Sequence, residues 1–153
     1  MNSSTDRIER NILLKAPRSQ VWRALADADE LGSWFGASLT GKIREVGQRV
    51  RGNVTYPGYE HLVFDVVIER LEPERILSWR WHPHPIDPKI DYTKEQTTLV
   101  VFELTEVEGG TLLSIVESGF DNIPASRRAE AFRGNSGGWD GQMKNIEKHV
   151  STS

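Results

Sequence analysis

Residues 97–118, TTLVVFELTEVEGGTLLSIVES, contain two strand-like runs separated by a Gly-Gly turn signal. In the first run, Val100, Phe102 and Leu104 share one face and the polar Glu103 and Thr105 share the other, which is the pattern of a strand with one buried face. A connection this short between two strands favours antiparallel pairing. The stretch therefore predicts an antiparallel hairpin that contributes one face to the protein core.

In the second run, the alternation of inward-facing residues extends to an acidic residue, Glu117. Leu113 and Ile115 occupy the inward face, and the same spacing places Glu117 inward as well. A carboxylate on a buried face is costly unless it is paired, hydrogen-bonded or protonated. Two interpretations stay open: a polar anchor or acid/base group inside a pocket, and a strand-end glutamate that reaches a salt bridge or water.

The rest of the chain surrounds this hairpin with strands and two kinds of helix. Strand-like runs rich in Val, Ile, Thr and aromatic residues also occupy 7–14, 61–71 and 76–81. After the first of these, apolar residues at helical spacing predict a short helix over 18–28 and another helical turn over 31–35.

The C-terminal part of the chain predicts a long helix that follows Pro124. Four apolar residues form one narrow stripe at helical spacing: Trp139, Met143, Ile146 and Val150. Asn135 or Ser136 could cap this helix. Glycine is a poor helix former, so a cluster of four glycines suggests either a break near 134–138 or a surface packed closely against the helix. These glycines are Gly134, Gly137, Gly138 and Gly141.

Helices in separate places and strands in consecutive order are typical of an α+β fold. We expect a curved antiparallel sheet of about six or seven strands, wrapped around the long C-terminal helix, with two short helices after the first strand. The length of 153 residues fits one domain over 1–153, in which the polar residues 1–5 form a flexible tail.

Composition excludes several functions. The chain has 19 Lys and Arg against 22 Asp and Glu, so we expect no nucleic-acid partner. It has no cysteine, which rules out disulfides, thiol catalysis and a Cys-based zinc site. No apolar run resembles a signal peptide or a membrane span, so we expect a cytoplasmic protein with no membrane partner. Glycine-rich nucleotide motifs are absent, and no cofactor is predicted.

One proline-rich segment contains metal-ligating residue types. His82, His84 and Asp87 lie close together, but the prolines between them hold the segment extended, and no third histidine is near. We therefore predict no metal site. Residues 82–96 form a loop that is long for a compact domain, and it is either a rigid connection or a lid over a cavity.

Two surface features of the C-terminal region have open interpretations. Arg127, Arg128 and Arg133 form a local basic patch, which is either a solvated helix face or a surface for an acidic partner. The glycine-rich back of the last helix is compatible with a homodimer, because small residues allow close approach of a second chain.

Aromatic residues could line a ligand cavity or fill a solid core. One helix does not easily fill the whole concave side of a curved sheet, which favours a cavity there. The candidate ligand-binding residues are Trp34, Phe35, Trp79, Trp81, Val100, Phe102, Leu113, Ile115, Glu117, Trp139 and Met143. Glu117 is also the one candidate catalytic residue, and His61 or Tyr92 could assist it.

The sequence resembles a known superfamily. The opening motif Ala16-Pro17-x-x-x-Val21-Trp22-x-Ala24-Leu25, followed by Leu31-x-x-Trp34-Phe35, resembles that of the START-like superfamily called SRPBCC. Further motifs resemble a bacterial subgroup of the branch named after the C-terminal domain of the activator of the 90-kDa heat-shock protein ATPase. These motifs are Trp81-His82-Pro83, Asp87-Pro88, Asp91-Tyr92, Glu117-Ser118-Gly119-Phe120-Asp121 and Gly138-Trp139-x-x-Gln142-x-x-Asn145-Ile146.

The resemblance spans about residues 7–150 and implies a helix-grip fold with a cavity between sheet and helix. In many relatives this cavity holds an apolar or aromatic small molecule. The leading hypothesis is therefore binding of such a molecule. Two alternatives are a cyclase or dehydratase-type enzyme acting on an aromatic or polyketide-like substrate, and a chaperone-linked interaction module.

Overall fold

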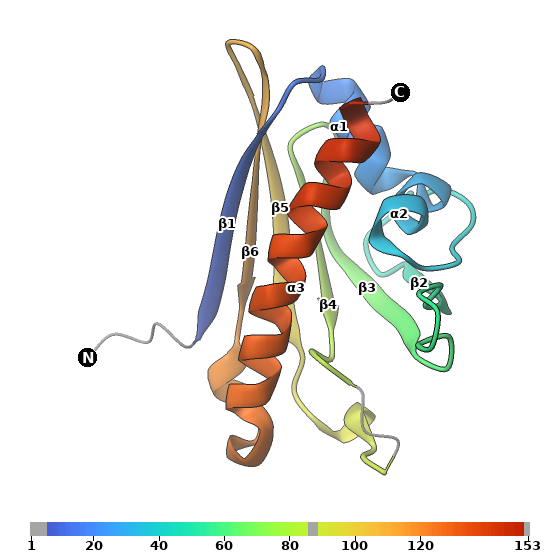
Figure 1. Ribbon diagram of the computed structural model, residues 1–153, viewed down its shortest axis with the longest axis vertical. Coiled ribbons are helices and arrows are strands. Elements are labelled where there is room, and N and C mark those ends of the chain that lie inside the picture. The colour runs from blue at the N-terminus through green and yellow to red at the C-terminus, as the bar shows by residue number, and fades with distance from the viewer. Residues whose placement is uncertain (1–5, 86–88, 152–153) are drawn as a thin grey trace.

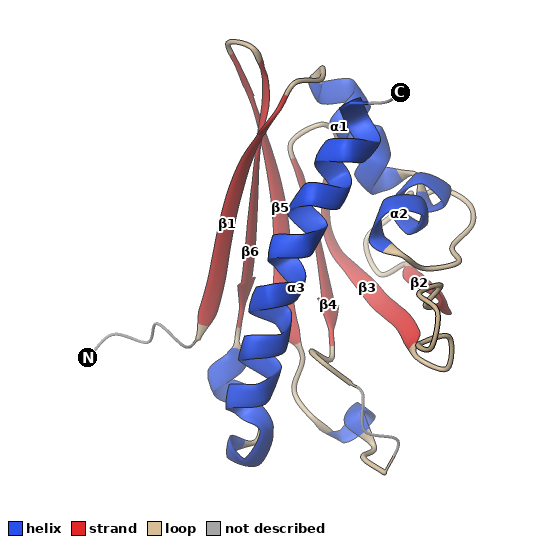
Figure 2. Ribbon diagram, viewed as in Figure 1, coloured by secondary structure: helices blue, strands red, loops and turns tan. Residues whose placement is uncertain are grey.

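A computed structural model describes residues 6–85 and 89–151. A curved antiparallel sheet forms one layer, and a long C-terminal helix runs diagonally across its concave face (Figure 1). Two shorter helices lie beside one end of the long helix (Figure 2). The predicted α+β helix-grip architecture is therefore confirmed. The predicted flexible tail, 1–5, lies outside the described residues.

Among the described residues, the sheet has six strands in the order β1-β6-β5-β4-β3-β2, and every neighbouring pair is antiparallel. The strands are β1 (Arg7–Leu14), β2 (Arg49–Asn53), β3 (Val63–Glu72), β4 (Ile76–Trp81), β5 (Thr98–Val107) and β6 (Gly110–Ser118). The hairpin predicted over 97–118 is β5–β6. Strand β2 was not predicted from the sequence, because it contains Arg49, Arg51 and Gly52 and only its Val50 is well buried.

In the part of the chain that the structure describes, the α-helices are α1 (Arg18–Ala26), α2 (Ala28–Phe35) and α3 (Ala125–Ser151), with two short 3-10 helices at Tyr92–Lys94 and Phe120–Asn122. Asp27 separates the first two, and its carboxylate accepts hydrogen bonds from the backbone N–H groups of Asp29 and Glu30 to cap α2. Gly36 ends α2 in the left-handed conformation, with φ of 97°. A side chain on Gly36 would also meet the Tyr56 ring, 2.4 Å from its Cβ position.

The predicted break in the last helix is wrong, as is the predicted cap at Asn135 or Ser136. Helix α3 runs without interruption from Ala125 to Ser151. Tertiary contacts, and not intrinsic helix propensity, stabilise the helical conformation of the glycine-rich turns. Arg10 on β1 donates to the Ser136 hydroxyl at 2.8 Å and binds the Asp140 carboxylate at 2.7 Å.

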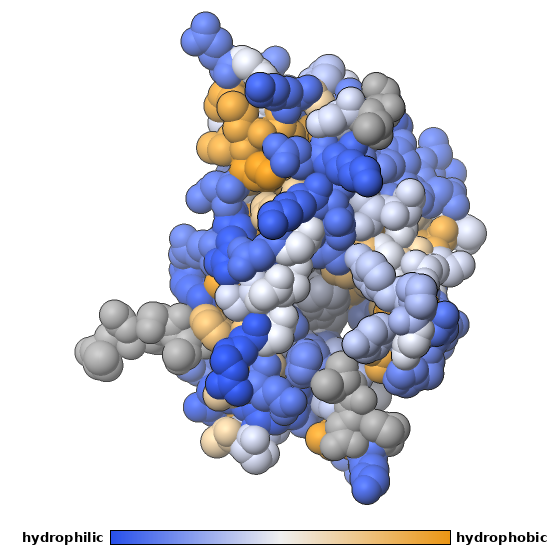
Figure 3. All heavy atoms as spheres, viewed as in Figure 1, coloured by the Kyte–Doolittle hydropathy of each residue, from blue (hydrophilic) through white to orange (hydrophobic). Residues whose placement is uncertain are grey.

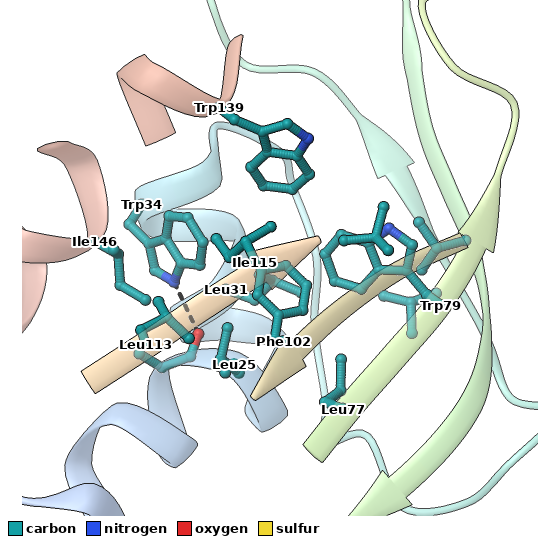
Figure 4. Packing of buried hydrophobic residues seen from close by; sticks show 14 of the residues in the cluster. Leu25, Leu31, Trp34, Leu77, Trp79, Phe102, Leu113, Ile115, Trp139 and Ile146 are labelled. Carbon is teal, nitrogen blue, oxygen red and sulfur yellow. Dashed lines mark hydrogen bonds between the residues drawn. The ribbon is translucent and has the colours of Figure 1, made fainter. Parts of the chain in front are cut away.

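The core lies between the sheet and α3. Trp139 points from α3 toward Phe102 and Ile115 on the central strands (Figure 4), and the Trp139 and Phe102 ring centroids are 5.8 Å apart. The Trp34 indole N–H donates to the backbone oxygen of Ala24 at 2.8 Å, which ties α2 to α1. This packing fixes the position of α3 and therefore the space beside it.

Candidate functional site

Glu117 lies on the inner face of β6 and has no exposed surface. Its cross-strand neighbours are Ile8 on β1 and Val100 on β5, both aliphatic. The inward placement predicted from the alternation is confirmed. The interpretation of Glu117 as a strand-end residue that reaches water is wrong, because α3 and Trp81 cover the carboxylate.

Four side chains donate hydrogen bonds to this carboxylate. Trp139 donates its indole N–H to Oε1 at 2.8 Å. Trp81 donates to Oε2 at 2.8 Å, and the Thr98 hydroxyl donates to the same oxygen at 2.6 Å. The Asn135 amide nitrogen lies 3.0 Å from each oxygen.

These contacts explain how the protein tolerates a buried carboxylate. Hydrogen bonds to an ionised acceptor are about twice as strong as neutral ones, and a carboxylate offers about four lone-pair sites. Within residues 6–85 and 89–151, no Lys, Arg or His forms an ion pair with Glu117. Neutral donors from two strands, β4 and β5, and from helix α3 therefore satisfy the carboxylate.

A pocket of about 540 Å³ opens beside this cluster, at the edge where α3 leaves β3 and β4 uncovered. Figure 3 shows the surface hollowed beside α3. Aromatic and aliphatic side chains supply most of its wall, namely Phe35, Ala37, Val54, Leu62, Val63, Phe64, Trp81, Pro85 and Ile90. Its polar lining is Arg51, Tyr56, His61, Asp65, His82, His84, Asp91, Tyr92, Thr93, Asn135 and Gln142.

The predicted binding residues fall into two groups. Phe35 and Trp81 line the pocket. The other predicted residues belong to the packed interior behind it: Trp34, Trp79, Val100, Phe102, Leu113, Ile115, Glu117, Trp139 and Met143. They do not line the pocket because α3 lies directly over the centre of the sheet, where their side chains fill the space.

Phe35 connects the pocket wall to the core. Its ring makes edge-to-face contacts with Phe64 at a centroid distance of 5.1 Å and with Trp81 at 6.0 Å. It also contacts the buried Trp79 and Trp139 rings, at 6.2 and 6.0 Å. Such contacts orient the rings beyond what burial alone provides. The wall is therefore preformed by core packing.

Asn135 and Gln142 also line the pocket, although neither was predicted from the sequence to contact a ligand. Asn135 lies one helical turn before Trp139, so both face the sheet. Gln142 donates to the backbone oxygen of Phe35 at 2.9 Å and accepts from Asn145 at 3.0 Å. Their spacing of four and three residues from Trp139 places all three side chains on one face of the helix, and this spacing was visible in the sequence.

Asp65, which lines the pocket, forms an ion pair with Arg49. Arg49 donates to both of its oxygens, at 2.8 and 2.6 Å. These hydrogen bonds lower the pKa of Asp65, and the charges of Arg49, Arg51 and His82 act in the same direction against partial burial. Asp65 is therefore a fixed anion at the mouth.

Arg127 on α3 binds two residues of the segment 89–96, Tyr92 and Glu95. Its guanidinium donates to the Glu95 carboxylate at 2.9 and 2.7 Å and lies 4.6 Å from the centre of the Tyr92 ring. Both interpretations of Arg127 as an exposed basic residue are wrong, because it is buried. Arg128 donates to the backbone oxygen of Ile123, and Arg133 is exposed.

The His84 ring packs against α3 at Gly134. A Cβ on Gly134 would lie 2.5 Å from the His84 Nδ1 atom, so only glycine allows this approach. Burial lowers the pKa of His84; nearby Glu130 opposes the shift, and Arg127 adds to it. Gly134 therefore fits the predicted close-packing surface, whereas Gly137, Gly138 and Gly141 face open space, as added Cβ atoms there would meet nothing.

The structure bears on two further expectations. Over residues 6–85 and 89–151, no three His, Asp or Glu side chains cluster as metal ligands. Asp87 from the proline-rich segment lies outside the described residues. In the same part of the chain, no helix is long and apolar enough to cross a membrane.

A curved antiparallel sheet that grips a C-terminal helix and leaves a pocket at its edge defines the START-like class of helix-grip domains. The family model described as "Activator of Hsp90 ATPase homolog 1-like protein" matches residues 15–151. The chain belongs to this family, which confirms the resemblance seen in the sequence. No curated protein matches the chain.

Solved structures share the fold. Protein MLL2253 from Mesorhizobium loti is 25% identical with a TM-score of 0.72, over 96% of this chain and 98% of that one. DynU16, from the dynemicin biosynthetic locus, is 22% identical with a TM-score of 0.71, over 96% of this chain but 48% of its own. The Aha1 dimer from Colwellia psychrerythraea is 19% identical with a TM-score of 0.68, over 94% and 95%.

Proposed function

We propose that this protein binds a small hydrophobic or aromatic molecule in the pocket beside α3. The observation that carries the proposal is the preformed aromatic wall of a cavity of about 540 Å³. Ligand pockets of roughly 300–1,000 Å³ with apolar walls and few polar groups are usual for small molecules. Phe35 and Trp81 supply flat ring surfaces, and residues from 82–85 and 90–93 add to the lining.

Native mass spectrometry of the protein purified from cells tests the proposal. We expect a retained small molecule that is released on denaturation. Phe35→Leu should reduce its occupancy, because Phe35 contributes a ring to the wall. Phe132→Leu is the matched control, since Phe132 is also half-buried but contacts Phe120 away from this pocket. Equal occupancy in both variants, or failure of aromatic probes to bind the native protein, would contradict the proposal.

A cyclase or dehydratase-type activity is the second candidate, favoured by the titratable side chains in the same pocket. His61 and Tyr92 line it, but their suggested partner Glu117 does not, so Glu117 is not proposed to contact substrate. DynU16, which shares the fold, comes from a biosynthetic locus. Incubation with aromatic polyketide-like compounds should then give products that have lost water, and unchanged compounds would reject this candidate.

A chaperone-linked interaction module would have a filled interior. The pocket beside α3 therefore disfavours this function. A homodimer remains a prediction, supported by the dimeric Colwellia relative and by the exposed face at Gly137, Gly138 and Gly141. Light scattering of the purified protein measures the oligomeric state. A dimer that Gly138→Leu dissociates would place the contact on this face.

A further inference from the structure

Asn135 is the pocket residue whose orientation the structure determines most tightly. Its amide nitrogen lies 3.0 Å from both oxygens of Glu117. Trp139 and Trp81 donate to those same oxygens, and an indole nitrogen only donates. With both oxygens already accepting, the Asn135 group that faces them must be the NH2 and not the carbonyl.

This orientation directs the other branch of the amide, Oδ1, away from Glu117. Asn135 lines the pocket and is half-buried. Within residues 6–85 and 89–151, no donor forms a hydrogen bond with Oδ1, and this atom is not sealed from the cavity. The pocket wall therefore presents a fixed acceptor without a protein partner.

The neighbouring polar groups of the inner wall are already used. Gln142 donates to Phe35 and accepts from Asn145. The Trp81 N–H is bound to Glu117. A ligand that packs on the Trp81 ring thus meets Asn135 Oδ1 as an acceptor beside that ring, because both side chains bind the same Glu117 oxygen. The carboxylate behind the amide polarises it and strengthens Oδ1 as an acceptor.

We infer that Asn135 makes the pocket selective for aromatic ligands that carry a hydrogen-bond donor, such as a phenolic hydroxyl. This inference rests on the proposed function and specifies its ligand class. A donor pairs with Oδ1, whereas an ether leaves Oδ1 without a partner. A carboxylate places a second anion near Glu117 and is disfavoured.

Calorimetry with naphthol, its methyl ether and naphthoate tests the inference. We expect naphthol to bind the native protein roughly three- to tenfold more tightly than the ether, the range for one neutral hydrogen bond. Naphthoate should bind least. Shifts in the side-chain amide signals of Asn135 and the indole signal of Trp81 in NMR spectra locate the probe in this pocket.

Two variants separate selectivity from stability. Asn135→Ala removes the acceptor, so the preference for naphthol over the ether should disappear while both still bind. Thr98→Val also removes a donor to Glu117, but Thr98 does not line the pocket, so the preference should persist. Thermal unfolding confirms that each variant is folded.

The outcomes are distinguishable. Failure of every aromatic probe to bind the native protein overturns the proposed function and this inference with it. Equal affinity for naphthol and the ether leaves the ligand-binding function standing and overturns the role of Asn135. A preference that survives in Asn135→Ala, or disappears in Thr98→Val, also overturns that role.

Discussion

Replacing Glu117 by glutamine exchanges one acceptor oxygen for an NH2 group inside a cluster of donors. If the NH2 replaces Oε1, it faces the Trp139 N–H, and if it replaces Oε2, it faces the Trp81 N–H. Either arrangement leaves a buried indole N–H without an acceptor. The Thr98 hydroxyl can rotate, and the Asn135 amide can turn its Oδ1, to accept from the new group, but neither supplies an acceptor for the indole N–H.

The magnitude follows from these contacts. A buried donor without a partner costs about 1–3 kcal/mol, and the remaining hydrogen bonds also lose the assistance of the charge. We expect Glu117→Gln to lower the free energy of unfolding by about 3 kcal/mol. For a domain of this size that corresponds to a fall in Tm of roughly 6–12 °C.

Urea unfolding followed by tryptophan fluorescence and circular dichroism measures this loss. Glu103→Gln is the matched control, because Glu103 lies on the adjacent strand β5 and is exposed. Its effect should stay within about 0.5 kcal/mol. A loss below about 1 kcal/mol for Glu117→Gln, or an equal loss in both variants, would refute the account of a carboxylate held by neutral donors.

Three further predictions concern α3, its loop and the pocket mouth. Gly141→Ala should stabilise the protein by about 0.5–1 kcal/mol in thermal unfolding, since the site is helical and open, whereas Gly134→Ala should lose this gain because its Cβ meets the His84 ring. Burial lowers the pKa of His84 below its ordinary value of 6.5, so unfolding takes up a proton as the pH falls below 6.5, and stability should decrease there. His84→Asn keeps the positive φ of 52° accessible and should flatten this dependence in unfolding measured at several pH values. Hydrogen bonds from Arg49 lower the pKa of Asp65, so the small stability that Asp65→Asn removes at neutral pH should shrink as the pH falls below the ordinary pKa of 3.8. It should vanish only below the lower pKa of the folded protein, which urea unfolding at several acidic pH values measures.

Much of the fold could be predicted from local patterns. The alternation over 97–118 and 76–81 requires extended backbone with one apolar face, whatever the rest of the chain does. Strand β2 gave no such signal, because only Val50 is well buried and the strand is held by pairing with β3. The continuity of α3 was also unpredictable, because contacts from β1, His84 and Glu95 override the low helix propensity of its glycines.

The pocket was harder to predict than the core for a physical reason. Core and ligand cavity both require apolar side chains, so Trp79 and Trp81 look alike in the sequence, two residues apart on one strand face. Only the path of α3 decides that Trp79 is fully covered while Trp81 reaches the pocket. That path depends on packing among α1, α2 and the sheet, which local periodicity does not encode.

The buried carboxylate is more informative about the site than about stability. A buried charge replaced by well-packed apolar groups often leaves a protein equally stable, so stability alone gives little reason for Glu117. Its hydrogen bonds reach two pocket residues, Trp81 and Asn135, and orient both from behind. If Glu117 acts by positioning them, substitutions there should alter ligand preference through Asn135 even though Glu117 itself touches no ligand. This separates a positioning role from the direct anchoring suggested by the sequence.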